Sequence, residues 1–134
     1  QPMLEEKAEL YGPHIRGLIE AGLRIDAVRY SRALENRLQF IADTRSLASR
    51  ADVLLTPTTP TPAPSDLSVT GSAMFQGPWT SCGLPTVTVP SGLSATGLPL
   101  GIQLVAGPLA ERRLLTAALW CERQLALDLR PPLP

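Results

Sequence analysis

The chain has 134 residues, 44% of them hydrophobic, which is enough for one globular domain with a sizeable core. Twelve basic residues balance twelve acidic ones, so no field of one sign would draw the chain to nucleic acid or to an anionic membrane surface. Because the apolar runs are shorter than the roughly 20 residues that span a bilayer, we expect a cytoplasmic protein without a membrane partner.

Helical spacing of apolar residues dominates the first third of the chain. Between residues 3 and 22 this spacing is broken at Pro13, which predicts two short helices. From Ile25 to Ser49 it recurs every three and four residues, with Asp26 placed as an N-cap, and predicts one long amphipathic helix. Arg37 lies on the apolar stripe of that helix, so its guanidinium either reaches solvent at the edge or pairs inside the fold, where a carboxylate is the expected partner.

The middle of the chain predicts a strand and then loops. Residues 52–56 (DVLLT) form a short apolar run typical of a buried strand, and the alternate prolines of residues 57–64 predict a rigid loop. Residues 65–83 are rich in Ser, Gly and Thr and predict a loop long enough to have a functional role.

The last third predicts a hairpin and a closing helix. Residues 85–90 (PTVTVP) carry β-branched side chains at a period of two, and the turn-forming SGLSATG leads into an apolar run over residues 98–106. Helical spacing returns over residues 110–127 and predicts a helix that packs on the sheet.

Four segments, taken in order, resemble the C-terminal part of amidase-signature enzymes: a helix that carries Arg37, then DVLLTPTTPTPAP, WTSCGLPTVTVPSG and GLPLGIQLVAGP. The resemblance is close over residues 52–127 and looser before them. It implies an α/β fold in which helices flank a mixed β-sheet, and this chain holds only part of it. Residues 1–50 would be a helical segment, and residues 51–134 the C-terminal sheet and closing helix of one amidase domain.

Members of that family hydrolyse carboxamides with a serine nucleophile, a bridging serine in a cis peptide and a lysine base. In the family these groups precede the region seen here, and the chain begins with Gln1 inside a predicted helix, so we expect a fragment with no catalytic residue of its own. Lys7, the only lysine, lies among glutamates that would keep it charged. Ser81 has no GxSxG elbow, and His14 is solitary, so neither completes a catalytic set.

The resemblance implies that this part supplies the core of the fold and a wall of the acyl pocket. The pocket candidates lie at the end of the predicted long loop: Phe75, Trp79, Thr80, Ser81 and Cys82. The two aromatic residues offer large apolar faces to a substrate, but they would equally serve as core. Packing explains the three residues that follow as well as substrate contact does.

The implied partner is a small-molecule amide in the full-length enzyme, with no cofactor and no metal. Family members that act on glutamine in tRNA amidation carry an acidic residue about where Ser72 and Ala73 stand, which argues against that substrate. A second hypothesis is a non-catalytic, amidase-like remnant or partner subunit. In either case we expect unpaired sheet edges to make the isolated chain self-associate or dock with the missing N-terminal part.

Overall fold

The computed structural model describes residues 2–129 of the chain. Its contacts divide the chain into two units, residues 1–36 and residues 37–134. The predicted organisation, with a helical segment over residues 1–50 of one domain, stays a prediction. None of the helices within residues 2–129 is long and apolar enough to cross a membrane.

The first unit is helical, as the spacing predicted. It contains α1 (Pro2–Glu6), a 3-10 turn (Ala8–Leu10), α2 (Pro13–Leu23) and the first part of α3 (Ala27–Ala48). The predicted break at Pro13 is confirmed, because this proline is the first residue of α2, where a missing N–H costs nothing.

The predicted long helix is confirmed as α3, together with its N-cap. The Oδ1 atom of Asp26 accepts the backbone N–H of Arg29 at 2.8 Å, which satisfies a free donor of the first turn. The predicted apolar stripe is largely uncovered, since the side chains of Tyr30 and Leu38 are 60% and 66% exposed. Within the described residues, α3 buries only Thr44 and Ala48, near its C-terminal end.

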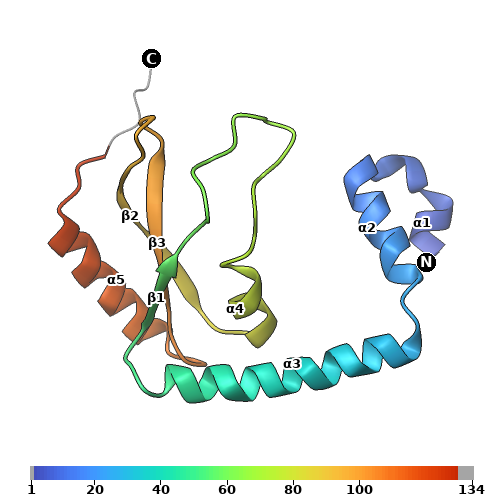
Figure 1. Cartoon of the computed structure of the whole chain (residues 1–134), viewed down its shortest axis with the longest axis horizontal. Coiled ribbons are helices and arrows are strands. Elements are labelled where there is room, and N and C mark those ends of the chain that lie inside the picture. The colour runs from blue at the N-terminus through green and yellow to red at the C-terminus, as the bar shows by residue number, and fades with distance from the viewer. Residues whose placement is uncertain (1, 130–134) are drawn as a thin grey trace. The chain divides into compact units, whose positions relative to one another are not determined.

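The second unit is built on a three-stranded antiparallel sheet in the order β1-β3-β2, which confirms the α/β class with a sheet flanked by helices (Figure 1). Its strands are β1 (Leu54–Pro57), β2 (Thr86–Leu93) and β3 (Pro99–Val105). β2 and β3 are the predicted hairpin. The register places Gln103 of β3 between Thr56 of β1 and Thr88 of β2. β1 forms an edge of this sheet and is half-buried rather than buried as predicted, since Leu55 is 62% exposed.

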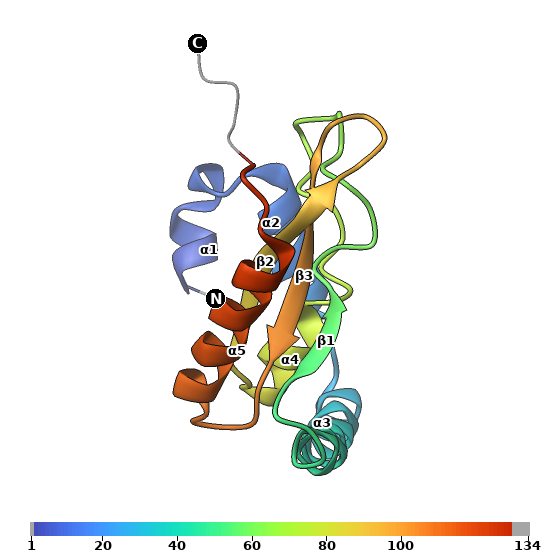
Figure 2. The same ribbon diagram turned by 90° about the vertical axis from the view of Figure 1, so that its left-hand side faces the viewer.

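Helices cover both faces of the sheet (Figure 2). The predicted closing helix is confirmed as α5 (Glu111–Leu125), and it packs on β2 and β3. It shares with them the α5-side cluster: Val89, Leu104, Ala106, Leu114 and Ala118. The opposite face carries the α4-side cluster of Cys82, Leu84 and Val105, against which Ile41, Leu54 and Trp79 pack.

The predicted loop over residues 65–83 is wrong for residues 77–82, which form α4 (Gly77–Cys82). Pro78 stands in the first turn, where proline is well tolerated. Gly83 ends the helix in the left-handed conformation, with φ 65°, as glycine commonly does at a helix C-terminus. Six residues are too few to show helical spacing, so the composition of Gly, Pro and Ser masked the helix.

Arg37 joins α3 to α4. Its Nε atom donates to the backbone carbonyl oxygen of Ser81 at 2.9 Å. The expected carboxylate partner is therefore wrong, and the guanidinium instead satisfies a carbonyl in the last turn of a helix, where positive charge is favourable. This hydrogen bond lies next to Cys82, which is only 4% exposed.

Replacing Gly101 with alanine should destabilise the sheet. A Cβ atom there would lie 2.8 Å from Cγ2 of Thr88 and 2.9 Å from Oγ1 of Thr58, so β-branched neighbours would have to move. We expect a loss of about 1–3 kcal/mol in the free energy of unfolding, measured by urea denaturation. Gly107→Ala is the matched control, since nothing lies within 4 Å of its added Cβ. Equal stabilities of the two variants would contradict the packing described.

Replacing Arg37 with alanine should expose Cys82 to thiol reagents. Loss of the hydrogen bond removes at most about 1 kcal/mol, and so raises the population of open α4 by up to about fivefold. Cys121 lies elsewhere in the unit and provides an internal reference for the rate of iodoacetamide alkylation. Arg45→Ala, on the same helix, should leave the ratio of the two rates unchanged. An unchanged ratio in Arg37→Ala as well would show that the bond does not hold α4.

Candidate functional site

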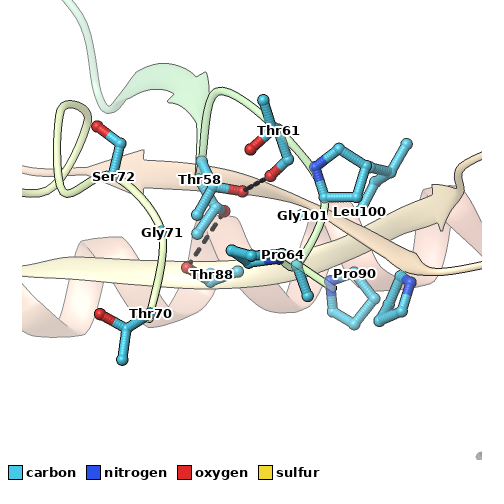
Figure 3. A pocket seen from close by; sticks show the side chains of 14 residues that line it. Thr58, Thr61, Pro64, Thr70, Gly71, Ser72, Thr88, Pro90, Leu100 and Gly101 are labelled. Carbon is cyan, nitrogen blue, oxygen red and sulfur yellow. Dashed lines mark hydrogen bonds between the residues drawn. The ribbon is translucent and has the colours of Figure 1, made fainter. Parts of the chain in front are cut away.

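A pocket of about 370 Å³ lies between the loop after β1 and the β2–β3 hairpin. We call it the Thr58 pocket (Figure 3). Hydroxyl groups and proline rings dominate its lining, which consists of Thr58, Thr59, Thr61, Pro62, Ala63, Pro64, Thr70, Gly71, Ser72, Thr88, Pro90, Pro99, Leu100 and Gly101. Its volume falls in the range of small-molecule sites.

Thr58 is fixed by three hydrogen bonds to three different elements. Its backbone N–H donates to the carbonyl of Gly101 on β3 at 3.0 Å. Its carbonyl accepts Nε2 of Gln76, the residue that precedes α4, at 2.6 Å. Its hydroxyl donates to the hydroxyl of Thr88 on β2 at 3.3 Å, the contact drawn in Figure 3. The loop is therefore anchored to the sheet where the pocket begins.

Gln103 supports the same region from the centre of the sheet. Its side chain is 2% exposed, and its Nε2 atom donates to the hydroxyl of Thr56 at 3.2 Å and to the carbonyl of Phe75 at 2.8 Å. These bonds tie β1 and the segment before α4 to β3. A buried amide with both donor protons used is strongly held, because breaking either bond leaves polar groups unsatisfied.

The bulge in β2 shapes the hairpin wall of the pocket. Pro90 pairs with Gly101 and Gly92 with Leu100, so Ser91 is the extra residue on β2. A bulge of this kind bends its strand and increases the local twist. Pro90, Leu100 and Gly101 all line the pocket at this bend.

No charged side chain lines the Thr58 pocket. Residues 53–110 contain a single charged residue, Asp66, which lies outside the lining. Hydrogen bonds from the backbone N–H and the side chain of Ser68 lower the pKa of Asp66, so that exposed carboxylate stays ionised at neutral pH. The site can offer hydroxyl groups, backbone dipoles and apolar ring faces, but no counter-ion.

The residues predicted for the substrate pocket lie on or just before α4, outside the lining of the Thr58 pocket. Phe75 and Trp79 are half-buried, and Trp79 packs against the α4-side cluster. Cys82 is buried in that cluster, whereas Thr80 and Ser81 are exposed. Their contact with a substrate stays a prediction.

Two polar atoms at α4 are buried without a hydrogen-bond partner among the described residues. They are Nε1 of Trp79 and Oε1 of Gln76. Gln76 nevertheless holds Thr58 through its other side-chain atom. α4 therefore touches the Thr58 pocket indirectly, through the residue that begins it.

Sequence reasoning did not identify the threonines of the pocket. The alternate prolines of residues 57–64 predict a rigid loop, and that pattern gives the hydroxyl groups between them no role. The available signal was the coincidence of threonines in that loop with Thr86 and Thr88, which alternate on one face of β2. Alternation alone could not show that the loop folds back onto that face.

The described residues do not assemble a nucleophile with a base. Lys7 and His14 are both exposed residues of the first unit. Across residues 2–129, no hydrogen bond joins a serine hydroxyl to either of them. In the same part of the chain, no three His, Cys, Asp or Glu side chains are grouped so that they could hold a metal ion.

Comparison with known proteins gives relatives that are much longer than this chain. AmiD of Mycobacterium tuberculosis, a putative amidase by name, is 32% identical over 121 residues, which are 83% of this chain and 26% of AmiD. One polypeptide of the mitochondrial glutamyl-tRNA(Gln) amidotransferase of Xenopus laevis is 38% identical over 135 residues, covering 89% of this chain and 26% of that polypeptide. The chain thus spans about a quarter of the length of these curated relatives.

Solved structures and a family model agree with this similarity. A crystal structure of an amidase superposes with a TM-score of 0.80 at 25% identity, over 90% of this chain and 30% of that one. The family model described as Amidase matches residues 6–115. A match over most of the sequence shows the family, and the fold is that of a part of an amidase: the chain belongs to the amidase family.

Proposed function

We propose that this chain is the C-terminal part of an amidase, a hydrolase that cleaves the C–N bond of a small-molecule carboxamide. In this proposal the chain supplies part of the fold core and a wall of the acyl pocket. The serine nucleophile, the bridging serine and the lysine base come from an N-terminal part. The observation that carries the proposal is membership of the amidase family over only about a quarter of its relatives' length.

The chemistry that the proposal assigns elsewhere explains why this chain needs no reactive group. A neutral lysine would remove the serine proton through the bridging serine while the serine oxygen attacks the amide carbon. The amine leaves with a proton, and water then opens the acyl-enzyme ester to release the acid. Within the described residues, neither Lys7 nor His14 has the serine contact that this relay requires.

Exposed apolar side chains support docking with another polypeptide segment. On α5, Leu115 is 60% exposed and Trp120 is 62% exposed. On the edge strand β1, Leu55 is 62% exposed, and β1 has a neighbour on one side only within the described sheet. Monomeric proteins rarely leave such large side chains and a sheet edge uncovered together. We propose that the N-terminal part of the amidase covers them, and that isolated chains otherwise associate with each other.

We also propose that the protein works in the cytoplasm. Cys82 and Cys121 are unpaired thiols, as is usual in reducing compartments.

The proposal predicts that the isolated chain releases no ammonia from simple amides, whereas a chimera does. In the chimera, this chain replaces the matched segment of AmiD. We expect the chimera to hydrolyse an amide that intact AmiD, the positive control, also hydrolyses. Ammonia release from acetamide, hexanamide and benzamide is the measurement.

Ser81→Ala in the chimera separates a structural serine from a nucleophile. We expect a loss far smaller than the roughly 10⁴-fold or greater loss that follows removal of a catalytic nucleophile. Ammonia release by the purified, isolated chain that disappears in Ser81→Ala would instead place the nucleophile in this chain. An inactive, folded chimera beside active AmiD would contradict the proposed contribution to an amidase fold.

A further inference from the structure

We propose that the Thr58 pocket accepts the uncharged, ring-sized acyl group of a carboxamide and rejects acyl groups that carry a charge. The inference rests on the proposed function, because it names the class of substrate that the site would take. It draws on three features of the pocket: its lack of charge, its facing proline rings and its free hydroxyl donors.

The lining has no side chain that could compensate a charge. A carboxylate or ammonium group that enters a pocket loses part of its hydration, and only a counter-ion or several aligned dipoles can replace it. The one charged residue in residues 53–110 is Asp66, and it is already engaged by Ser68 outside the lining. The hydroxyl groups of threonine solvate a charge only in part, so an uncharged group is favoured.

Proline rings come to the pocket from two different elements. Pro64 belongs to the loop after β1, and Pro90 belongs to β2; both project toward the pocket in Figure 3. Their rings are rigid and apolar, and they lose no side-chain freedom when a ligand packs on them. Proline surfaces pack well on aromatic rings, as they do when aromatic grooves bind proline-rich segments. A pocket of about 370 Å³ leaves room for such a ring.

Two hydroxyl groups of the pocket keep a proton to donate. The hydroxyl oxygen of Thr88 accepts from Thr58, and that of Ser72 accepts the backbone N–H of Met74 at 3.3 Å. A hydroxyl carries one donor proton besides its lone pairs, so each proton remains available to a ligand. The favoured group is thus neutral and apolar with a hydrogen-bond acceptor, such as an aromatic carboxamide.

Three ligands of matched size test the charge preference on the 134-residue chain: benzamide, the anion terephthalamate and the cation 4-(aminomethyl)benzamide. Saturation-transfer NMR detects binding from the ligand signals and works equally on a self-associated protein. Amide shifts of Thr88 and Gly101 locate the site where the protein is monomeric. We expect benzamide to bind at least about tenfold more tightly than either charged analogue, because each of those must shed water without a partner.

A charge placed in the lining should reverse the preference. Thr70→Lys puts an ammonium group at an exposed loop position of the pocket, so terephthalamate should then bind at least as tightly as benzamide. Leu67→Lys is the matched control: Leu67 lies on the same loop, is 98% exposed and is not part of the lining. It should keep the order of affinities found in the parent chain.

Equal or tighter binding of a charged analogue by the parent chain would overturn the inference. So would identical effects of the two lysine variants, or ligand shifts confined to residues outside the Thr58 pocket. None of these measurements involves turnover. Failure of the AmiD chimera to hydrolyse amides, with selective benzamide binding intact, would therefore count against the proposed function and leave the binding preference standing.

Discussion

The second unit depends on the buried carboxamide of Gln103. Its two donor protons reach Thr56 on β1 and the carbonyl of Phe75 before α4, while its backbone holds the centre of β3. Three segments that are distant in sequence are thereby fixed at one point. An apolar residue of similar size would fill the space, but it would leave the carbonyl of Phe75 buried or open to rearrangement. The hydrogen bonds thus add position to what the apolar clusters supply as cohesion.

The Thr58 pocket follows from that fixed point. Gln103 sets the segment that leads to α4, Gln76 at the start of α4 holds the carbonyl of Thr58, and the Thr58 hydroxyl reaches Thr88. Gly101 lets these threonines approach the centre of the sheet, since any side chain would meet both. The two faces of the sheet divide the work: α5 buries an apolar face, and the other face carries a polar row that continues into the pocket.

Local pattern was enough to predict most elements of the fold. The apolar run of β1, the period-two alternation of β2 and the spacing of α3 and α5 are properties of adjacent residues, and Asp26 and Pro13 mark helix starts within one turn. α4 escaped because six residues give no period. The contacts that build the site lie beyond such patterns: Thr58 meets Thr88 across 30 residues, and Arg37 meets Ser81 across 44. Only the tertiary fold brings these partners together.

The distribution of charge along the chain divides its response to solvent. Nearly all ionisable side chains belong to the helices and their flanks, where pairs such as Arg16 and Glu20 are exposed and screened by salt. The sheet and the proline loop between them hold their geometry through neutral hydrogen bonds and apolar contacts. Ionic strength and pH near neutrality therefore act on the helical surfaces that would meet a partner, and leave the shape of the ligand pocket nearly untouched.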